Sequence, residues 1–406
     1  MSQPGIFQQA SAVLNSIYQQ ETGRSILTAT EPNFISVANT VLSLGKDKVY
    51  NALMGVIGRT VFSIRPYSAH LKGMEMSLEK WGEYSRKISI VDSSMHDNQA
   101  YKYPVTYDAS ESSNPTGNGL SVDPWIINKR EFLETYFVGS SVFQDHYSIM
   151  EKQLITAFQS PEQLMQFISM HTIDESNKIE QYKEGISHAL LCNLIASLIA
   201  ENDSSRVVKL LTLYNSELGL EGNNAFTAET IARPDNYRPF RQWAYAKMAA
   251  ISNRMEERSV MYQTNITNKP VPRHTPYADQ KLYMFADDKF AMDATVLANT
   301  FNPSFIKNSD FETVNFWQSI QSPSAINLKP TYTNTSGQPT TAGSAVSKGH
   351  VFAVLFDRNA CGWRMVDHTT DLTPKNPNGQ YRNVWHNMLI KSVQDNTEKA
   401  VVFLME

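Results

Sequence analysis

Residues 281–302, KLYMFADDKFAMDATVLANTFN, change their pattern partway along. The apolar run LYMF predicts a buried strand, and the apolar residues that follow recur at spacings of four, three and four, which predicts an amphipathic helix. That helix face consists of Phe290, Ala294, Leu297 and Phe301. Asp287 and Asp288 stand between the two patterns, where carboxylates cap free N–H groups and meet the positive end of the helix dipole. We expect them to begin a helix, not to bind a metal or protonate a substrate.

The composition is that of a soluble globular protein with two or three lobes. The chain has 406 residues, of which 41% are apolar and 19% charged. Its 36 basic and 40 acidic residues give a net charge of -4, which provides no general attraction for DNA or anionic lipid. Two cysteines, Cys192 and Cys361, predict free thiols in a reducing compartment. We expect no secretory signal and no membrane span, because the longest apolar stretch, residues 189–200, is too short.

Two segments near the amino terminus are predicted to be arms. Residues 1–23 carry apolar residues at helical spacing, Phe7 and Leu14 among them, with Glu21 as the only charged side chain. An arm that condenses RNA by charge would be basic, so RNA condensation is not indicated.

Residues 67–125 are polar and interrupted by turns. Two strand-like segments in this range, WGEYSRKISIVD and QAYKYPVTYD, predict a hairpin. This hairpin has too few aliphatic residues to bury itself, so we expect it to lie on another surface.

The middle of the chain predicts helices. Ser160, Pro161 and Gln163 give an N-terminal cap signal, and after a predicted break near residues 171–174 a single helix of about 40 Å is expected over 175–201. Another helix is expected from about Pro239 to Arg258.

The last third of the chain predicts strands. VFAVLFD and GWRMVD flank a turn, Asn378-Gly379 is a hairpin signal, and KAVVFLM is a buried closing strand. The low-complexity residues 331–349 are expected to form a mobile loop.

Motifs for chemistry are scarce. The nine histidines show no metal-binding spacing, and the chain lacks both a phosphate-binding P-loop and a dinucleotide fingerprint. Asp367 and His368 form a tempting pair, but neighbours on a strand point to opposite faces. Arg233, Arg238 and Arg241 are the densest basic group, which we interpret as a solvated or inter-subunit patch, with a nucleic-acid contact as the alternative.

The order of these elements resembles that of tailed-bacteriophage major capsid proteins with the Hong Kong 97 fold. LYMFADDKFAMDATVLANTFN looks like their strand and helix in the axial domain, and VFAVLFDRNACGWRMVD looks like their late strand and turn. KNPNGQYRNVWHNMLIKSVQDNTEKAVVFLM resembles their closing strands, most closely those of small-headed, short-tailed phages. The resemblance covers residues 50–406 and is strongest after residue 281.

The resemblance implies an α+β fold of this capsid type. The implied parts are an N-terminal arm (1–45), a strand leading into the peripheral domain (46–66), an extended hairpin loop (67–130), a peripheral domain with a long spine helix (131–205), an axial domain (206–366) and return strands of the peripheral domain (367–406). The implied inter-subunit contacts are Tyr101, Tyr103, Tyr107, Trp125, Arg238, Arg241, Phe7 and Leu14. Some relatives cross-link subunits through a loop lysine, but no acceptor asparagine and glutamate match here.

The implied function is structural: a major capsid protein without enzymatic activity or cofactor. Copies would assemble in the bacterial host cytoplasm into hexamers and pentamers of an icosahedral virion shell around double-stranded DNA. The expected partners are the chain itself, scaffolding and portal proteins, and a weakly contacted genome, with no membrane. Two alternatives remain open at this point: the shell of an encapsulin nanocompartment, and a cytosolic enzyme with a site around Asp367, His368 and His386.

Overall fold

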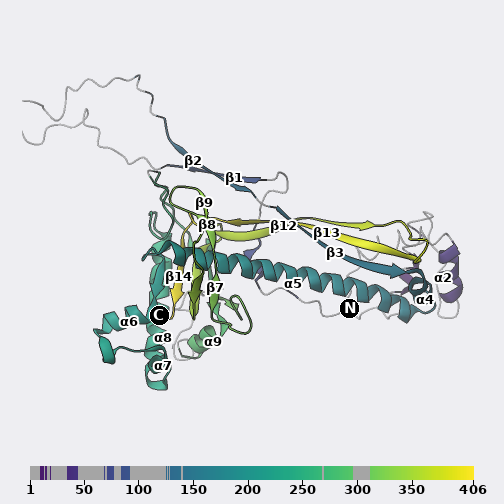
Figure 1. The fold of residues 1–406 in the computed structure, drawn as a ribbon. Helices are drawn as coiled ribbons and strands as arrows, with labels where there is room; N and C mark the ends of the chain where they lie inside the picture. The colour runs from purple at the N-terminus through teal and green to yellow at the C-terminus, as the bar shows by residue number, and fades with distance from the viewer. Residues whose placement is uncertain are drawn as a thin grey trace, which may run out of the picture.

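A computed structural model describes residues 10–12, 14–15, 19, 34–43, 68, 71–76, 84–91, 125, 127, 129–138, 140–267, 269–295 and 311–406. The predicted strand of residues 46–66 lies outside these ranges. The described chain has a long helix beside an extended sheet, a second sheet with helices at one end, and a hairpin above both (Figure 1).

One sheet of five strands holds the main core. Its order is β4 (Val207–Lys209), β14 (Ala400–Leu404), β11 (Val351–Asp357), β5 (Gln280–Phe285) and β6 (Phe311–Val314). Strands β11 and β14 are buried along their full length, which explains their unbroken apolar sequences. Alternation sends Val402 and Leu404 toward α5, whereas Val401 and Phe403 pack with α8.

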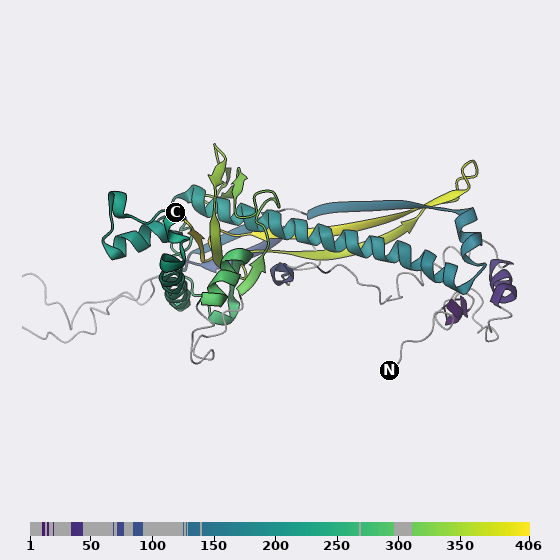
Figure 2. The same ribbon diagram turned by 90° about the horizontal axis from the view of Figure 1, so that it is seen from below.

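The extended sheet is antiparallel and lies along α5. Its order is β12 (Cys361–Leu372), β13 (Tyr381–Gln394) and β3 (Ser140–Met150). Figure 2 shows α5 running along this sheet for most of its length. Every second residue of β13 from Arg382 to Ile390 is buried, as a strand with one covered face requires. The turn between β12 and β13 contains Asn378-Gly379, so that predicted hairpin is confirmed.

Helix α5 runs unbroken from Pro161–Glu201, so the predicted break near residues 171–174 is wrong. Ser160 begins the helix as expected, because its side chain accepts a hydrogen bond from the Gln163 N–H at 3.2 Å. The polar residues around His171 do not interrupt it, because the His171 ring stacks on Tyr147 of β3 with ring centroids 4.7 Å apart. The helix ends at Asn202, whose φ of 52° is left-handed.

The remaining helices gather near the five-stranded sheet, except for α2 (Phe34–Ser43) and α4 (Glu151–Ala157) at the far end of α5 (Figure 1). They are α6 (Leu210–Leu218), α7 (Ala228–Ile231), α8 (Pro234–Glu256) and α9 (Ala286–Thr295). Within the described ranges, short 3-10 turns span Lys72–Met74, Gly222–Asn224 and Tyr277–Asp279. Helix α8 begins at Pro234 and not at the predicted Pro239, because Pro234 takes the first-turn position and Pro239 lies inside the helix.

Asp288 has a structural role that its position in the chain does not reveal. Its carboxylate accepts a hydrogen bond from Arg241 Nη2 at 2.8 Å and lies 2.7 Å from His350 Nε2, and the side chain is almost fully buried. The expectation that Asp288 only begins α9 is therefore wrong, whereas Asp287 is exposed in the first turn. Arg241 is buried by the same pairing, so it is not part of a solvated patch.

The late strands divide between the two sheets, and the loop expected over residues 331–349 contains strands instead. VFAVLFD and GWRMVD flank a turn as expected, and the chain changes sheet there, so strands β11 and β12 do not pair with each other. The closing strand β14 lies in the five-stranded sheet, so residues 367–406 divide between two sheets. Residues 331–349 contain β8 (Thr331–Thr333), β9 (Pro339–Thr341) and β10 (Val346–Lys348), and the last pairs with β7 (Ile326–Leu328).

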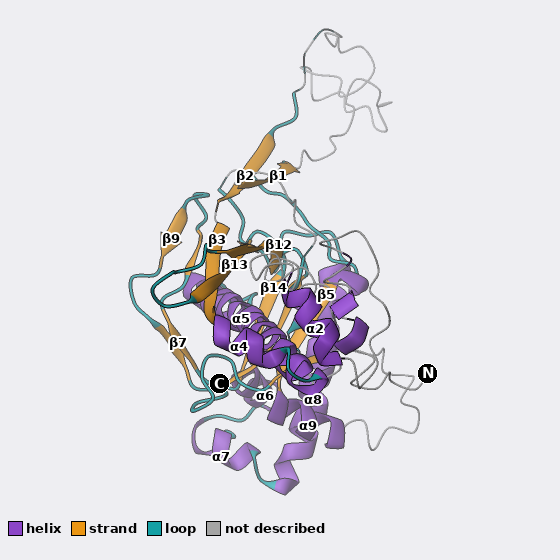
Figure 3. Ribbon diagram, turned by 90° about the vertical axis from the view of Figure 1, so that its right-hand side faces the viewer, coloured by secondary structure: helices purple, strands orange, loops and turns teal. Residues whose placement is uncertain are grey.

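The hairpin has a different second strand from the predicted one. Strand β1 (Tyr84–Ile90) pairs antiparallel with β2 (Phe132–Val138), and the predicted partner, residues 99–108, lies outside the described residues. Figure 3 shows β1 and β2 projecting from the rest of the fold.

Both cysteines are free, as predicted, and the structure shows that both are also buried. Among the described helices, none is long and apolar enough to cross a membrane.

Candidate functional site

The projecting hairpin has one face that is exposed yet partly apolar. Alternation along β1 and β2 places six exposed side chains on this outer face: Arg86, Ile88, Ile90, Phe132, Glu134 and Tyr136. Its four large apolar or aromatic members are each just over half exposed, between 51% and 53%. Trp125 and Ile127, which precede β2, are 86% and 79% exposed. Several large apolar side chains left exposed on one hairpin indicate an interaction site.

Polar contacts connect three side chains of the outer face. Arg86 forms an ion pair with Glu134 at 2.6 Å, and the Tyr136 hydroxyl donates to the same carboxylate at 2.7 Å. These hydrogen bonds, first from Tyr136 and then from Arg86, lower the pKa of Glu134. The carboxylate is therefore ionised at neutral pH, and it links Arg86 of β1 to Tyr136 of its own strand β2.

The inner face of the hairpin is fastened to the body by ion pairs. Lys87 contacts both Asp395 and Glu398, and Arg273 donates to Glu398 at 2.7 Å. We call these four residues the latch. Arg273 also donates to the Ser89 hydroxyl of β1 at 3.2 Å. Both carboxylates are almost fully buried, and buried charges are retained only when they are paired. The latch therefore sets the direction in which the hairpin projects.

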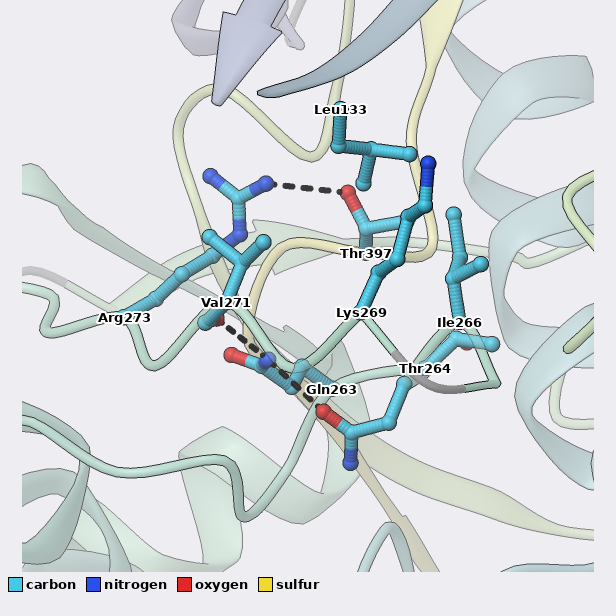
Figure 4. A pocket seen from close by; sticks show the side chains of 9 residues that line it. Leu133, Gln263, Thr264, Ile266, Lys269, Val271, Arg273 and Thr397 are labelled. Atoms are coloured by element: carbon cyan, nitrogen blue, oxygen red, sulfur yellow. Dashed lines mark hydrogen bonds between the residues drawn. The ribbon is translucent and has the colours of Figure 1, made fainter. Parts of the chain in front are cut away.

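The packing beneath β2 leaves no room for a ligand. Figure 4 shows Leu133 of β2 facing Ile266, Lys269, Arg273 and Thr397. The cavity among them is about 10 Å³, which suffices for one water at most. The contact between hairpin and body is thus a joint and not a small-molecule site.

The latch predicts a specific acid sensitivity. Burial alone would raise the pKa of Asp395, but Lys87 and hydrogen bonds from Thr397 outweigh it and hold this pKa below its usual value. A lowered folded-state pKa adds stability that is present above the unfolded pKa, about 3.9, and is lost as the pH falls through the folded value. Urea unfolding should show Asp395→Asn to be less stable than the parent at pH 6, with the gap narrowing below about pH 4. An equal gap at both pH values contradicts this role of Asp395.

The predicted contact residues have mixed positions. Trp125 and Arg238 are exposed and Leu14 is fully buried, while Arg241 is paired with Asp288. Phe7, Tyr101, Tyr103 and Tyr107 lie outside the described residues. Sequence reasoning missed the outer face of the hairpin, although the alternation of Ile88 and Ile90 was readable.

Of the three residues considered for an enzyme site, Asp367, His368 and His386, the structure brings only the two histidines together. His368 and His386 lie with ring centroids 5.6 Å apart, and both approach Glu175 of α5. Asp367 is exposed, and its carboxylate accepts a hydrogen bond from the His368 backbone N–H at 3.0 Å.

Solved structures share this architecture. The capsid structure of Staphylococcus phage Andhra matches with a TM-score of 0.54 and 10% identity, covering 86% of this chain and 87% of that one. A structure of the head fiber and inner core protein gp22 of native bacteriophage P68 matches with a TM-score of 0.50 and 13% identity, at the same coverage. At these identities the likeness shows the fold alone. No curated protein sequence matches the chain.

The fold, with its long helix, two sheets and projecting hairpin, is shared with a phage capsid structure. The sequence specifies the family further. A model of the Phi29-like phage major capsid protein family matches residues 12–403, and the chain belongs to that family. It is a structural subunit of a virion shell, and the family match favours this over the encapsulin alternative.

Proposed function

We propose that the outer face of the β1–β2 hairpin binds a neighbouring copy of this chain in a closed shell of hexamers and pentamers. The observation that carries the proposal is a half-exposed apolar face held rigidly away from the body by a buried latch. A protomer alone leaves this face in water, and a second copy covers it. The chain then acts as a building block without enzymatic activity.

The expected contact is modest for each subunit. Burying a large apolar side chain completely stabilises by about 1.5 to 3 kcal/mol, so covering a half-exposed one contributes about 1 kcal/mol. Four such residues, Ile88, Ile90, Phe132 and Tyr136, give only a few kcal/mol per hairpin. Repetition over every subunit makes the shell cohesive while single contacts stay reversible, which allows errors to be corrected during assembly.

We also propose how the fold divides into two capsid domains. The β12–β13–β3 sheet and α5 form the peripheral domain, and the five-stranded sheet with α6 to α9 forms the axial domain at the capsomer centre. The net charge of -4 suits a shell that holds double-stranded DNA loosely. Assembly in the bacterial host cytoplasm with scaffolding and portal proteins completes the proposal.

Charged substitutions on the outer face should prevent assembly without unfolding the protomer. The variant Ile88→Lys/Phe132→Lys places two charges where the neighbouring copy is proposed to bind, whereas in the free protomer both side chains are exposed. Electron microscopy should show shells from the parent protein and none from the variant, with unchanged circular dichroism.

Met170→Lys is the matched control, because Met170 is similarly exposed, at 59%, but lies on α5. It should assemble like the parent. The hairpin proposal is contradicted if the double variant still forms closed shells, or if the control loses assembly to the same extent.

A further inference from the structure

Two histidines and a glutamate from three separate elements meet between α5 and the extended sheet. Glu175 lies on α5, His368 on β12 and His386 on β13. Glu175 Oε1 is 2.7 Å from His386 Nδ1 and 3.4 Å from His368 Nε2, and each of the three residues has a possible ligand atom within 4.8 Å of those of the other two. The His386 side chain is 3% exposed, while that of His368 is 34% exposed. The cluster is therefore buried at His386 and accessible to solvent at His368.

This set of donors matches the chemistry of zinc. Two imidazoles and one carboxylate bind Zn²⁺ in sites with three protein ligands, and the fourth position holds water. Bonds of about 2.1 Å in a tetrahedron place ligand atoms about 3.4 Å apart. The separation of Glu175 and His368 already has this value. The shorter Glu175–His386 contact is a hydrogen bond that must lengthen slightly when a cation replaces its proton.

Buried polar atoms beside the cluster point independently to a ligand. His386 Nε2, His171 Nε2 and the Tyr147 hydroxyl have no hydrogen-bond partner among the described residues. The Tyr147 ring stacks on the rings of His171 and His386, with centroid distances of 4.7 and 5.6 Å. Each unpaired buried polar atom costs free energy, and a cation that keeps a water brings a partner into this region.

The local charge also favours a cation. Lys178 is the nearby ammonium, and it pairs with Asp145 at 3.1 Å and Asp174 at 2.9 Å. Adding Glu175 gives three carboxylates against one ammonium, a balance of -2 with neutral histidines. A cavity of about 190 Å³ is lined by Asp145, Glu175, Lys178 and His386, among others, and it provides a route for an ion.

We propose that Glu175, His368 and His386 form a zinc site that ties α5 to β12 and β13. The ion would join the middle of the long helix to two strands that are distant in sequence. Because the unfolded chain does not hold these three groups together, binding stabilises the folded state. This site is independent of the outer face of the hairpin.

Zinc binding by the untagged, full-length protein tests the proposal. Protein stripped with EDTA and dialysed against ZnCl₂ should retain one zinc per chain, and Zn²⁺ should raise its Tm. His368→Ala removes a half-exposed ligand and should weaken binding by more than about tenfold and abolish the Tm shift. Should that variant fold poorly by circular dichroism, Glu175→Gln replaces it, since it keeps the side-chain shape.

His274→Ala is the control, because His274 is an exposed histidine outside the cluster. It should bind zinc and gain Tm like the parent. Cobalt replacing zinc should give the visible absorption of a tetrahedral site in the parent and control only. The proposal is overturned if the parent retains no zinc, or if the His368 and His274 variants bind it equally.

Discussion

Replacing Arg206 by Met should destabilise the folded protomer by roughly 3 to 5 kcal/mol. Arg206 is fully buried where α5 ends, and it pairs with Glu201, the last residue of that helix. Its guanidinium also donates to Thr264 at 2.6 Å and to the backbone carbonyls of Asn396 and Ala400 at 3.2 and 3.3 Å. Methionine fills similar space but leaves these acceptors, and above all the Glu201 carboxylate, without their donor.

The matched control is Arg206→Met/Glu201→Gln. It removes the uncompensated carboxylate together with its partner, while the amide that replaces this carboxylate can keep its contacts to Thr264 and Asn396. Urea unfolding of the unassembled protein should show the double variant to be more stable than the single one, although less stable than the parent. If the free energy of unfolding of Arg206→Met lies within about 1 kcal/mol of the parent value, this buried pair does not hold the end of α5 to residues 396–400.

Local patterns in the sequence predicted local structure well. The strand over residues 282–285, the helix start at Ser160 and the hairpin at Asn378-Gly379 each depend on residues a few positions apart. Buried strands β11 and β14 were recognisable because both faces are covered, so their sequences are apolar throughout. The resemblance to phage capsid proteins rested on these same elements.

Pairings over long sequence separations could not be read in this way. Asp288 satisfies the rule for a helix start, but its partners Arg241 and His350 are 47 and 62 positions away. Strand β1 finds its partner 48 positions along, where Arg86 meets Glu134. Nothing in the local composition selects residues 132–138 over the equally strand-like residues 99–108.

The candidate site shows the same limit. The alternation of Ile88 and Ile90 in β1 predicts that one face differs from the other, and the usual expectation is that the apolar face is buried. In this structure the apolar face is exposed. The face with Lys87 and Ser89 is half-buried instead, because Lys87 contacts Glu398 and Ser89 accepts a hydrogen bond from Arg273. Which face turns outward is decided by that distant latch.

Replacing Lys87 by Met should therefore abolish shell assembly. Lys87 is the only residue of β1 that the described structure pairs with Asp395 and Glu398, whose side chains are 2% and 9% exposed. Without its ammonium, Asp395 keeps its contacts to Thr397 but loses its cation, at a cost of about 3 kcal/mol. Releasing the hairpin avoids this cost, because water can then solvate the carboxylate. We expect faster amide hydrogen exchange in residues 84–90 and no closed shells by electron microscopy.

Arg86→Met is a closely matched control, because it removes a cation from the adjacent residue of the same strand. The Arg86–Glu134 pair is exposed, at 47% and 39%, so its loss should cost about 0 to 1 kcal/mol and leave the hairpin attached. Lys87→Met/Asp395→Asn should restore stability, since no unpaired carboxylate remains at position 395, but not assembly, because the hairpin still lacks its ion-pair attachment. Shells from Lys87→Met would show that the hairpin is directed by backbone packing instead. Because Arg86 lies on the outer face, its variant is judged by hydrogen exchange and not by assembly, and exchange in residues 84–90 as fast as in Lys87→Met would contradict the role of the latch.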